Sequence, residues 1–173
     1  MRLAKLPLLI GCVALATGCG FHLRGKSPVA INFSRVYLDI RGAGRVAKEV
    51  RQQLQYNQVA LAPEQKWANL ILTLSNERFD ERVLSVDPST GKVRELELGY
   101  RVAFSARPPK GKPYIRKESI DLLRDVTFDE TAVLAKFDER EVVRKEMLKD
   151  AADAILRRLE SVKVESPTAE KKR

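Results

Sequence analysis

The fold class is decided by one stretch of the chain, Glu95-Leu-Glu-Leu-Gly-Tyr-Arg-Val-Ala-Phe-Ser-Ala106. Every second side chain from Leu96 to Ala106 is apolar or aromatic, and the side chains between them are mostly polar. Successive side chains of a strand point to opposite faces, so this alternation predicts a strand with one face on a core and one polar face. Such a strand needs a second layer of structure to cover its apolar face.

Three further stretches predict strands, at residues 35–40, 69–80 and 114–125. The segment Asp87-Pro-Ser-Thr-Gly91 is rich in turn formers, so we expect it to be the tip of a hairpin that leads into the central strand. Pro108-Pro-Lys-Gly-Lys-Pro113 predicts a second turn, between the central strand and the last one.

Two helices are expected from apolar side chains that recur every four residues. The first spans residues 44–57, and the second spans about 138–161, where the apolar stripe runs from Val143 to Leu159. Upstream of this stripe the pattern loses its phase, so residues 127–137 are expected to form a looser lead-in.

The sum of these elements is the order β-α-β-β-β-α. It predicts an α+β fold, a two-layer sandwich of two helices on a four-stranded mixed sheet. We expect this single domain to occupy residues 35–161. The last residues, 162–173, are polar and basic, and they are expected to form a disordered tail.

The first residues predict an anchor. A basic start and an apolar run indicate a lipoprotein signal peptide over residues 1–18, because the run is shorter than the roughly 20 residues of a transmembrane helix. Small residues precede Cys19, as in the lipobox of bacterial lipoproteins. Cys12 is the rival, but it would leave an apolar core of only about six residues. We therefore expect lipid on Cys19 and an irregular, lipidated segment at residues 19–34.

The charge of the chain points to anionic partners. The formal net charge is +9, and removal of Arg2 and Lys5 with the leader leaves +7 on residues 19–173. A basic surface attracts polyanions. A secreted protein meets lipid headgroups and, in Gram-negative bacteria, phosphorylated lipopolysaccharide rather than nucleic acid. A solvated basic surface without a specific partner is the alternative.

No residue pattern indicates catalysis, a metal or a cofactor. The two cysteines, Cys12 and Cys19, lie in or at the end of the leader, and the single histidine, His22, lies beside the anchor. No glycine-rich phosphate loop follows a strand. The many carboxylates alternate with Lys and Arg, which is typical of an ion-paired surface. We therefore expect a protein that is not an enzyme and that needs no cofactor.

The run Cys19-Gly-Phe-His-Leu-Arg-Gly25 resembles the start of the LptE family, the lipopolysaccharide-assembly lipoproteins of Gram-negative bacteria. The resemblance extends through the order of elements and three short segments, Gly91-Lys-Val-Arg-Glu95, Leu134-Ala-Lys136 and Leu156-Arg-Arg-Leu159. Gly20 stands where lipoproteins of the inner membrane commonly carry Asp, and this resembles the outer-membrane class.

The resemblance implies a non-enzymatic lipoprotein of the outer membrane that faces the periplasm and the lumen of the LptD barrel. It implies a 1:1 complex in which the lipoprotein helps the barrel to assemble, fills it and contacts lipopolysaccharide during delivery to the cell surface. In the family, basic residues before the central strand and before the last helix are implicated in that contact. The matching positions are Lys92 and Lys136, with Arg94 nearby; solvated lysines are the alternative. The alternative function is a generic periplasmic adaptor for another envelope protein.

Overall fold

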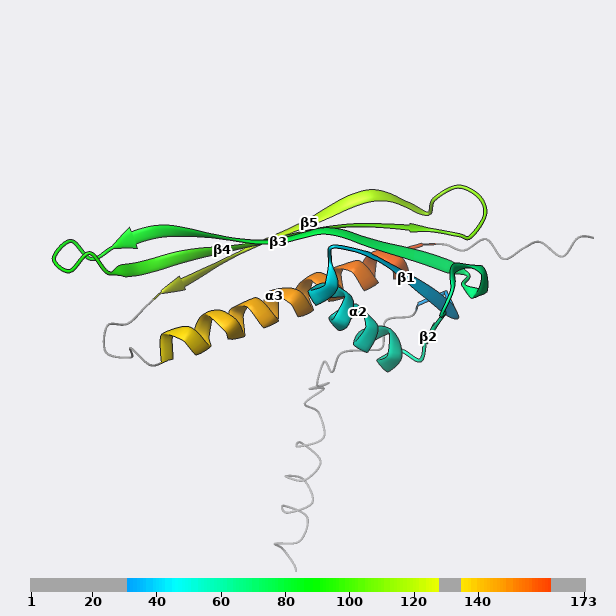
Figure 1. Cartoon of the computed structure of the whole chain (residues 1–173), viewed down its shortest axis with the longest axis horizontal. Helices are drawn as coiled ribbons and strands as arrows, with labels where there is room; N and C mark the ends of the chain where they lie inside the picture. Colours follow the sequence, from blue (N-terminus) through cyan, green and yellow to red (C-terminus); the bar gives the residue numbers. More distant parts are fainter. Residues whose placement is uncertain (1–30, 128–134, 163–173) are drawn as a thin grey trace, which may run out of the picture.

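The computed structural model describes residues 31–127 and 135–162 as two layers, a sheet and a pair of helices that cover one of its faces (Figure 1). The signal peptide, Cys19 and the tail from residue 163 onwards lie outside the described residues, as does most of the predicted lead-in. The elements in chain order are β1 (Arg35–Arg41), α2 (Gly44–Tyr56), β2 (Ala60–Leu61), the 3-10 helix η2 (Gln65–Trp67), β3 (Leu70–Val86), β4 (Val93–Arg107), β5 (Ile115–Thr127) and α3 (Ala135–Glu160).

The sheet is mixed, as predicted, but the prediction of four strands is wrong because the described sheet has five, in the order β2-β1-β3-β4-β5. The extra strand, β2, is an edge strand of two residues that runs parallel to β1 and pairs Arg35 with Ala60. Two residues are too few to show an alternating pattern. β1 also runs parallel to β3, and β3, β4 and β5 are antiparallel neighbours.

The predicted core face of the central strand is confirmed. Each of its six inward side chains is at most 5% exposed in β4: Leu96, Leu98, Tyr100, Val102, Phe104 and Ala106. The stripes of the two helices complete the same core. Its buried helical members are Val46, Ala47, Val50 and Leu54 of α2 with Met147, Ala151, Ala152, Ile155, Leu156 and Leu159 of α3. The apolar periodicity of the chain therefore specifies how the two layers pack.

A β-bulge changes the phase of β3. Ser75 pairs with Ala103 and Arg78 pairs with Arg101, so β3 holds one residue more than β4 across this interval. Asn76 lies in the interval with a φ of 55°, in the left-handed region that Asn tolerates better than most residues. Beyond the bulge the odd-numbered residues from Glu77 to Val83 face the helices, because Phe79, Glu81 and Val83 pair with the inward residues Tyr100, Leu98 and Leu96. The strand continues to Val86, six residues past its predicted end.

The two ends of the sandwich are different (Figure 1). At one end, which we call the hairpin end, the turn at residues 87–92 joins β3 to β4, and α3 begins beneath these strands. At the other end, which we call the loop end, lie η2, the β4–β5 loop at residues 108–114 and the first described residues, from Ile31. None of the described helices is long and apolar enough to cross a membrane.

Candidate functional site

The turn at the hairpin end is organised by one buried carboxylate, that of Asp87, which is 4% exposed. Its Oδ1 accepts hydrogen bonds from the backbone N–H groups of Ser89 and Thr90 at 2.8 and 2.7 Å and from both hydroxyls. Two backbone bonds close the turn, from Asp87 N to Lys92 O at 2.7 Å and from Gly91 N to Asp87 O at 2.8 Å. Gly91 adopts a φ of 69°, which favours glycine at this position.

These bonds keep Asp87 ionised. The hydroxyl of Ser89, the N–H groups of Thr90 and Ser89 and the hydroxyl of Thr90 all stabilise the carboxylate, and they hold its pKa well below the ordinary value despite burial. The second oxygen, Oδ2, pairs with the guanidinium of Arg94. The turn is therefore closed by hydrogen bonds around an ionised carboxylate, which also pairs with Arg94.

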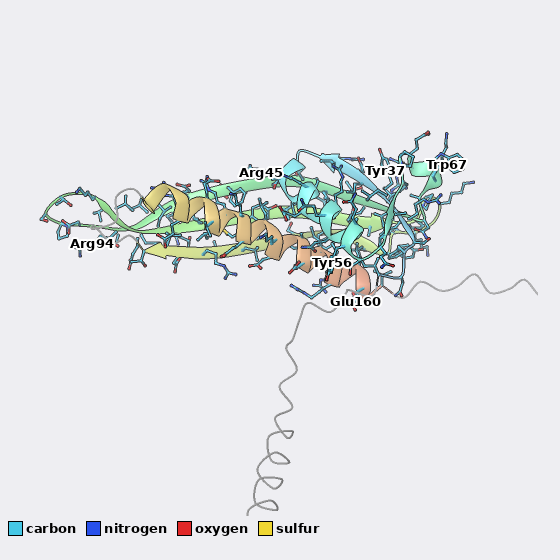
Figure 2. All side chains as sticks on the ribbon, turned by 90° about the horizontal axis from the view of Figure 1, so that it is seen from below. Tyr37, Arg45, Tyr56, Trp67, Arg94 and Glu160 are labelled. Carbon is cyan, nitrogen blue, oxygen red and sulfur yellow. The ribbon has the colours of Figure 1, made fainter. Side chains whose placement is uncertain are left out.

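The structure places two predicted site residues at this turn. Lys92 is its last residue and is exposed, with no ion pair to any other residue in the described part of the chain. Arg94 is the second residue of β4, directly after the turn, and Figure 2 shows it at the hairpin end. Its side chain is 54% exposed although it binds Asp87. Arg94 therefore both stabilises the turn and presents charge to solvent.

The third predicted residue, Lys136, is part of α3, which begins at Ala135, three residues before the predicted start of the main helix. The expectation that Lys136 precedes the helix is therefore corrected: its backbone belongs to the first turn. The ribbon of α3 begins under the β3–β4 hairpin (Figure 1). The fold thus brings the segment of Lys136 to the same end of the molecule as Lys92 and Arg94. The side chain of Lys136 lies outside the described residues.

Two further arginines approach the root of the hairpin, and sequence analysis did not select them. Arg140 and Arg144 of α3 both pair with Glu81 of β3, the first at 3.9 Å. The guanidinium of Arg144 also lies 5.7 Å from the ring centroid of Phe79 and pairs with Glu141 at 2.9 Å. Their spacing of four residues on one helix face was a signal for this cluster, because residues so spaced are neighbours on a helix.

The chemistry available at the hairpin end is recognition of anions. Guanidinium and ammonium groups bind phosphate by charge-assisted hydrogen bonds. Within residues 31–127 and 135–162 no group of three His, Cys, Asp or Glu side chains could hold a metal ion. The residues here are cations, together with the carboxylates that position some of them.

Comparison with known proteins gives this arrangement a context. The LptE family model, described as lipopolysaccharide-assembly, matches residues 33–159. The LPS-assembly lipoprotein LptE of Photorhabdus laumondii is 32% identical over 164 residues, which cover 94% of this chain and 88% of that protein. The protein of the same name from Pectobacterium atrosepticum is 29% identical over 188 residues, which cover 99% of this chain and all of the relative.

Solved structures show the same fold. The crystal structure of rare lipoprotein B from Shewanella oneidensis superimposes with a TM-score of 0.59 at 32% identity, covering 70% of this chain and 90% of that one. The solution structure of a lipoprotein B from Nitrosomonas europaea gives a TM-score of 0.66 at 29% identity, with coverage of 80% and 88%. By its sequence along nearly its whole length and by its fold, the chain belongs to the LptE family of lipopolysaccharide-assembly lipoproteins.

Proposed function

We propose that this protein is anchored by lipid on Cys19 to the outer membrane, where it assembles with an LptD-like barrel, fills its lumen and contacts lipopolysaccharide. The family match over residues 33–159 carries the proposal. The relatives are named for lipopolysaccharide assembly, and the family is not enzymatic. Lipopolysaccharide is here a cargo that the protein touches and not a substrate that it converts.

The outer face of the sheet supports the barrel part of the proposal. The helices leave this face uncovered (Figure 1), and ion pairs cross it between strands. Arg82 pairs with Glu97 at 2.9 Å, and Arg101 pairs with Asp121. Large barrels have polar interiors, so a polar sheet face of this kind is compatible with a barrel wall without burying unpaired charge.

The hairpin end supports the lipopolysaccharide part. Lys92 is exposed at the tip, Arg94 is held in place by Asp87, and α3 brings the segment of Lys136 to the same end. The phosphates of lipopolysaccharide are the anions that an envelope protein with this surface would meet. We propose Lys92, Arg94 and Lys136 as the contact residues, with the arginine partly engaged within the protein.

Co-purification tests the proposal. The protein carrying a C-terminal tag is isolated from outer membranes in mild detergent, and the partners are identified by mass spectrometry. We expect one large barrel in a 1:1 complex. Depletion of the protein should also lower the level of the folded barrel. Recovery of a different envelope protein, with the barrel unchanged on depletion, would establish the adaptor function in its place.

A further inference from the structure

The loop end exposes an aromatic side chain that the core does not use. Trp67, in η2, is 56% exposed, and Figure 2 shows it at the opposite end of the molecule from Arg94. The ammonium of Lys66 lies 5.5 Å from the centroid of its ring. Trp67 is the single tryptophan of the chain. Other large apolar side chains are exposed as well, Tyr56 and Leu123 most of all, but Trp67 combines an exposed indole with a cation over its ring.

Basic side chains share this end of the molecule with the indole. Five of them lie in β1, in η2 and in the β4–β5 loop with its flank: Arg35, Lys66, Arg107, Lys110 and Lys112. Residues 62–69 and 107–114 contain one carboxylate, Glu64, which pairs with Lys66 at 2.8 Å. The two loop lysines are exposed, and no ion pair joins either of them to another described residue. The loop end is therefore strongly cationic.

Hydrogen bonds connect η2 to the neighbouring sheet strands. The guanidinium of Arg35 donates to the carbonyl of Trp67 at 3.5 Å, and the backbone N–H of Arg35 donates to Asn69 Oδ1 at 3.0 Å. The guanidinium of Arg107 donates to Gln65 Oε1 at 3.5 Å. These bonds tie η2 to the start of β1 and the end of β4, so the indole shares one surface with Arg35 and Arg107, and Lys110 and Lys112 follow in the adjoining loop.

The chain also enters the domain at this end. The amide of Asn32 donates to the carbonyl of Val162 at 3.4 Å, and the rings of Phe33 and Tyr114 lie with centroids 5.5 Å apart. Cys19 is twelve residues before Ile31, a distance of at most about 40 Å for an extended chain. A lipid on Cys19 would therefore hold the loop end within about 40 Å of the bilayer.

We propose that the loop end rests on the phospholipid headgroups of the membrane that holds the anchor, with the Trp67 indole at the interface and the lysines on lipid phosphates. The proposal rests on the anchor at Cys19 proposed above. Indole rings favour the headgroup level because they are apolar with one polar N–H. A basic patch beside an acyl anchor strengthens membrane attachment and responds to anionic lipid.

The single tryptophan makes the contact directly measurable. The mature, acylated protein is reconstituted into vesicles of phosphatidylcholine with 30% phosphatidylglycerol, where part of the phosphatidylcholine is brominated near the top of its acyl chains. Bromine quenches an indole only at short range, so quenching reports Trp67 at the interface. We expect a blue-shifted, strongly quenched emission. Lys110→Glu with Lys112→Glu should lower the quenched fraction by about half or more, because each cation contributes to attraction by anionic lipid.

The control reverses the same number of charges elsewhere. Lys145 and Lys149 are exposed on α3, and Lys145→Glu with Lys149→Glu should leave the quenching of Trp67 at its wild-type level. Vesicle flotation, measured on the same samples, reports the anchor separately. Protein that floats with an unquenched Trp67, or with quenching that the two double variants lower equally, overturns the membrane contact and leaves the anchor intact. Protein that neither floats nor is quenched overturns both.

Discussion

Tyr100 donates its phenolic hydrogen to Oε1 of Glu77 across 3.1 Å, inside the boundary between the sheet and α2. The same carboxylate accepts from the backbone N–H groups of Arg45 and Val46 at 3.1 and 3.0 Å, and the side chain of Glu77 is 3% exposed. The N-cap residue of α2, Ala43, offers no side-chain cap, so a residue of β3 caps this helix. Burial, with the charge of Glu77 beside it, raises the pKa of Tyr100 above its ordinary value, and the phenol remains a donor.

Removal of this carboxylate should destabilise the domain at three points. Glu77→Ala leaves two N–H groups of α2 without a cap and buries the Tyr100 hydroxyl without an acceptor. We expect a loss of about 2–4 kcal/mol in the free energy of unfolding, measured by urea denaturation. Tyr100→Phe removes one hydrogen bond and should cost only about 1 kcal/mol. A Glu77→Ala protein within 0.5 kcal/mol of wild type would show that the helix does not need this cap.

The central strand provides a second test of the core. Phe104 is 1% exposed and belongs to the cluster that joins β4 to the two helices. Phe104→Ala leaves a cavity between the layers, and the free energy of unfolding should fall by about 3–5 kcal/mol. Ser105→Ala, on the opposite face of the same strand, is the control and should remain within about 0.5 kcal/mol of wild type. Equal effects of the two changes would contradict the assigned faces.

The strands and helices that follow a regular apolar period could be predicted because the period itself specifies which side chains meet. The alternation from Leu96 to Ala106 specifies the core face of β4, and the side chains on that face are buried. The two residues of β2 carry no period. The phase change at Asn76 depends on a bulge, whose position is set by pairing with β4 and not by local sequence.

The candidate site likewise has one part that the sequence predicts and one part that depends on contacts formed in the fold. The turn formers from Asp87 to Gly91 place the hairpin tip, and Lys92 with it. The engagement of Arg94 by Asp87 follows from turn geometry, which the sequence pattern does not contain. The contact between Arg144 and Glu81 joins residues 63 apart in the chain, and no local pattern encodes it. Charge in a sequence is therefore a guide to which end of the molecule is cationic and a poor guide to which of its charged side chains are engaged within the protein.

The low pKa of Asp87 gives the turn a defined dependence on pH. Because the folded pKa lies below the ordinary value of 3.8, the carboxylate stabilises the fold fully above that pH. This contribution is lost as the pH falls from about 4 towards the folded pKa. Asp87→Asn lacks it, so the difference in unfolding free energy between wild type and variant should be constant from pH 7 to pH 5 and shrink at pH 3. A difference that stays constant down to pH 3 would contradict the role of the charge.

The anchor can be tested by mass spectrometry of the mature N-terminus. We expect cleavage before Cys19, with a diacylglyceryl group on its sulfur, in outer-membrane fractions. Cys19→Ala should yield no lipidated product, and Cys12→Ala should be processed like wild type because it changes only the apolar run of the leader. Lipid found on Cys12, or a Cys19→Ala protein that is still lipidated, would show that Cys19 is not the anchor.

The last prediction concerns the lipopolysaccharide contact. Arg94 is unsuitable for charge reversal, because a glutamate there would face Asp87 and disrupt the turn. The test variant is therefore Lys92→Glu with Lys136→Glu, and the control is Lys145→Glu with Lys149→Glu, which makes the same change of charge elsewhere. A single exposed charge contributes about 1 kcal/mol or less to binding. Reversing both charges replaces attraction to the phosphates by repulsion at two positions. We expect binding of purified lipopolysaccharide at low salt to weaken at least about tenfold in the test variant.

The control variant should bind within about twofold of wild type, and wild-type binding should itself weaken as salt screens the charges. The circular dichroism spectrum and the midpoint of unfolding are measured for both variants, so that a loss of binding is not mistaken for a loss of fold. Both variants should also still recover the barrel on co-purification, because the hairpin tip is a small part of the surface. If both variants bind lipopolysaccharide equally well, the two lysines are solvated surface and the contact lies elsewhere. If both weaken equally, the attraction is one of net charge and has no site at the hairpin end.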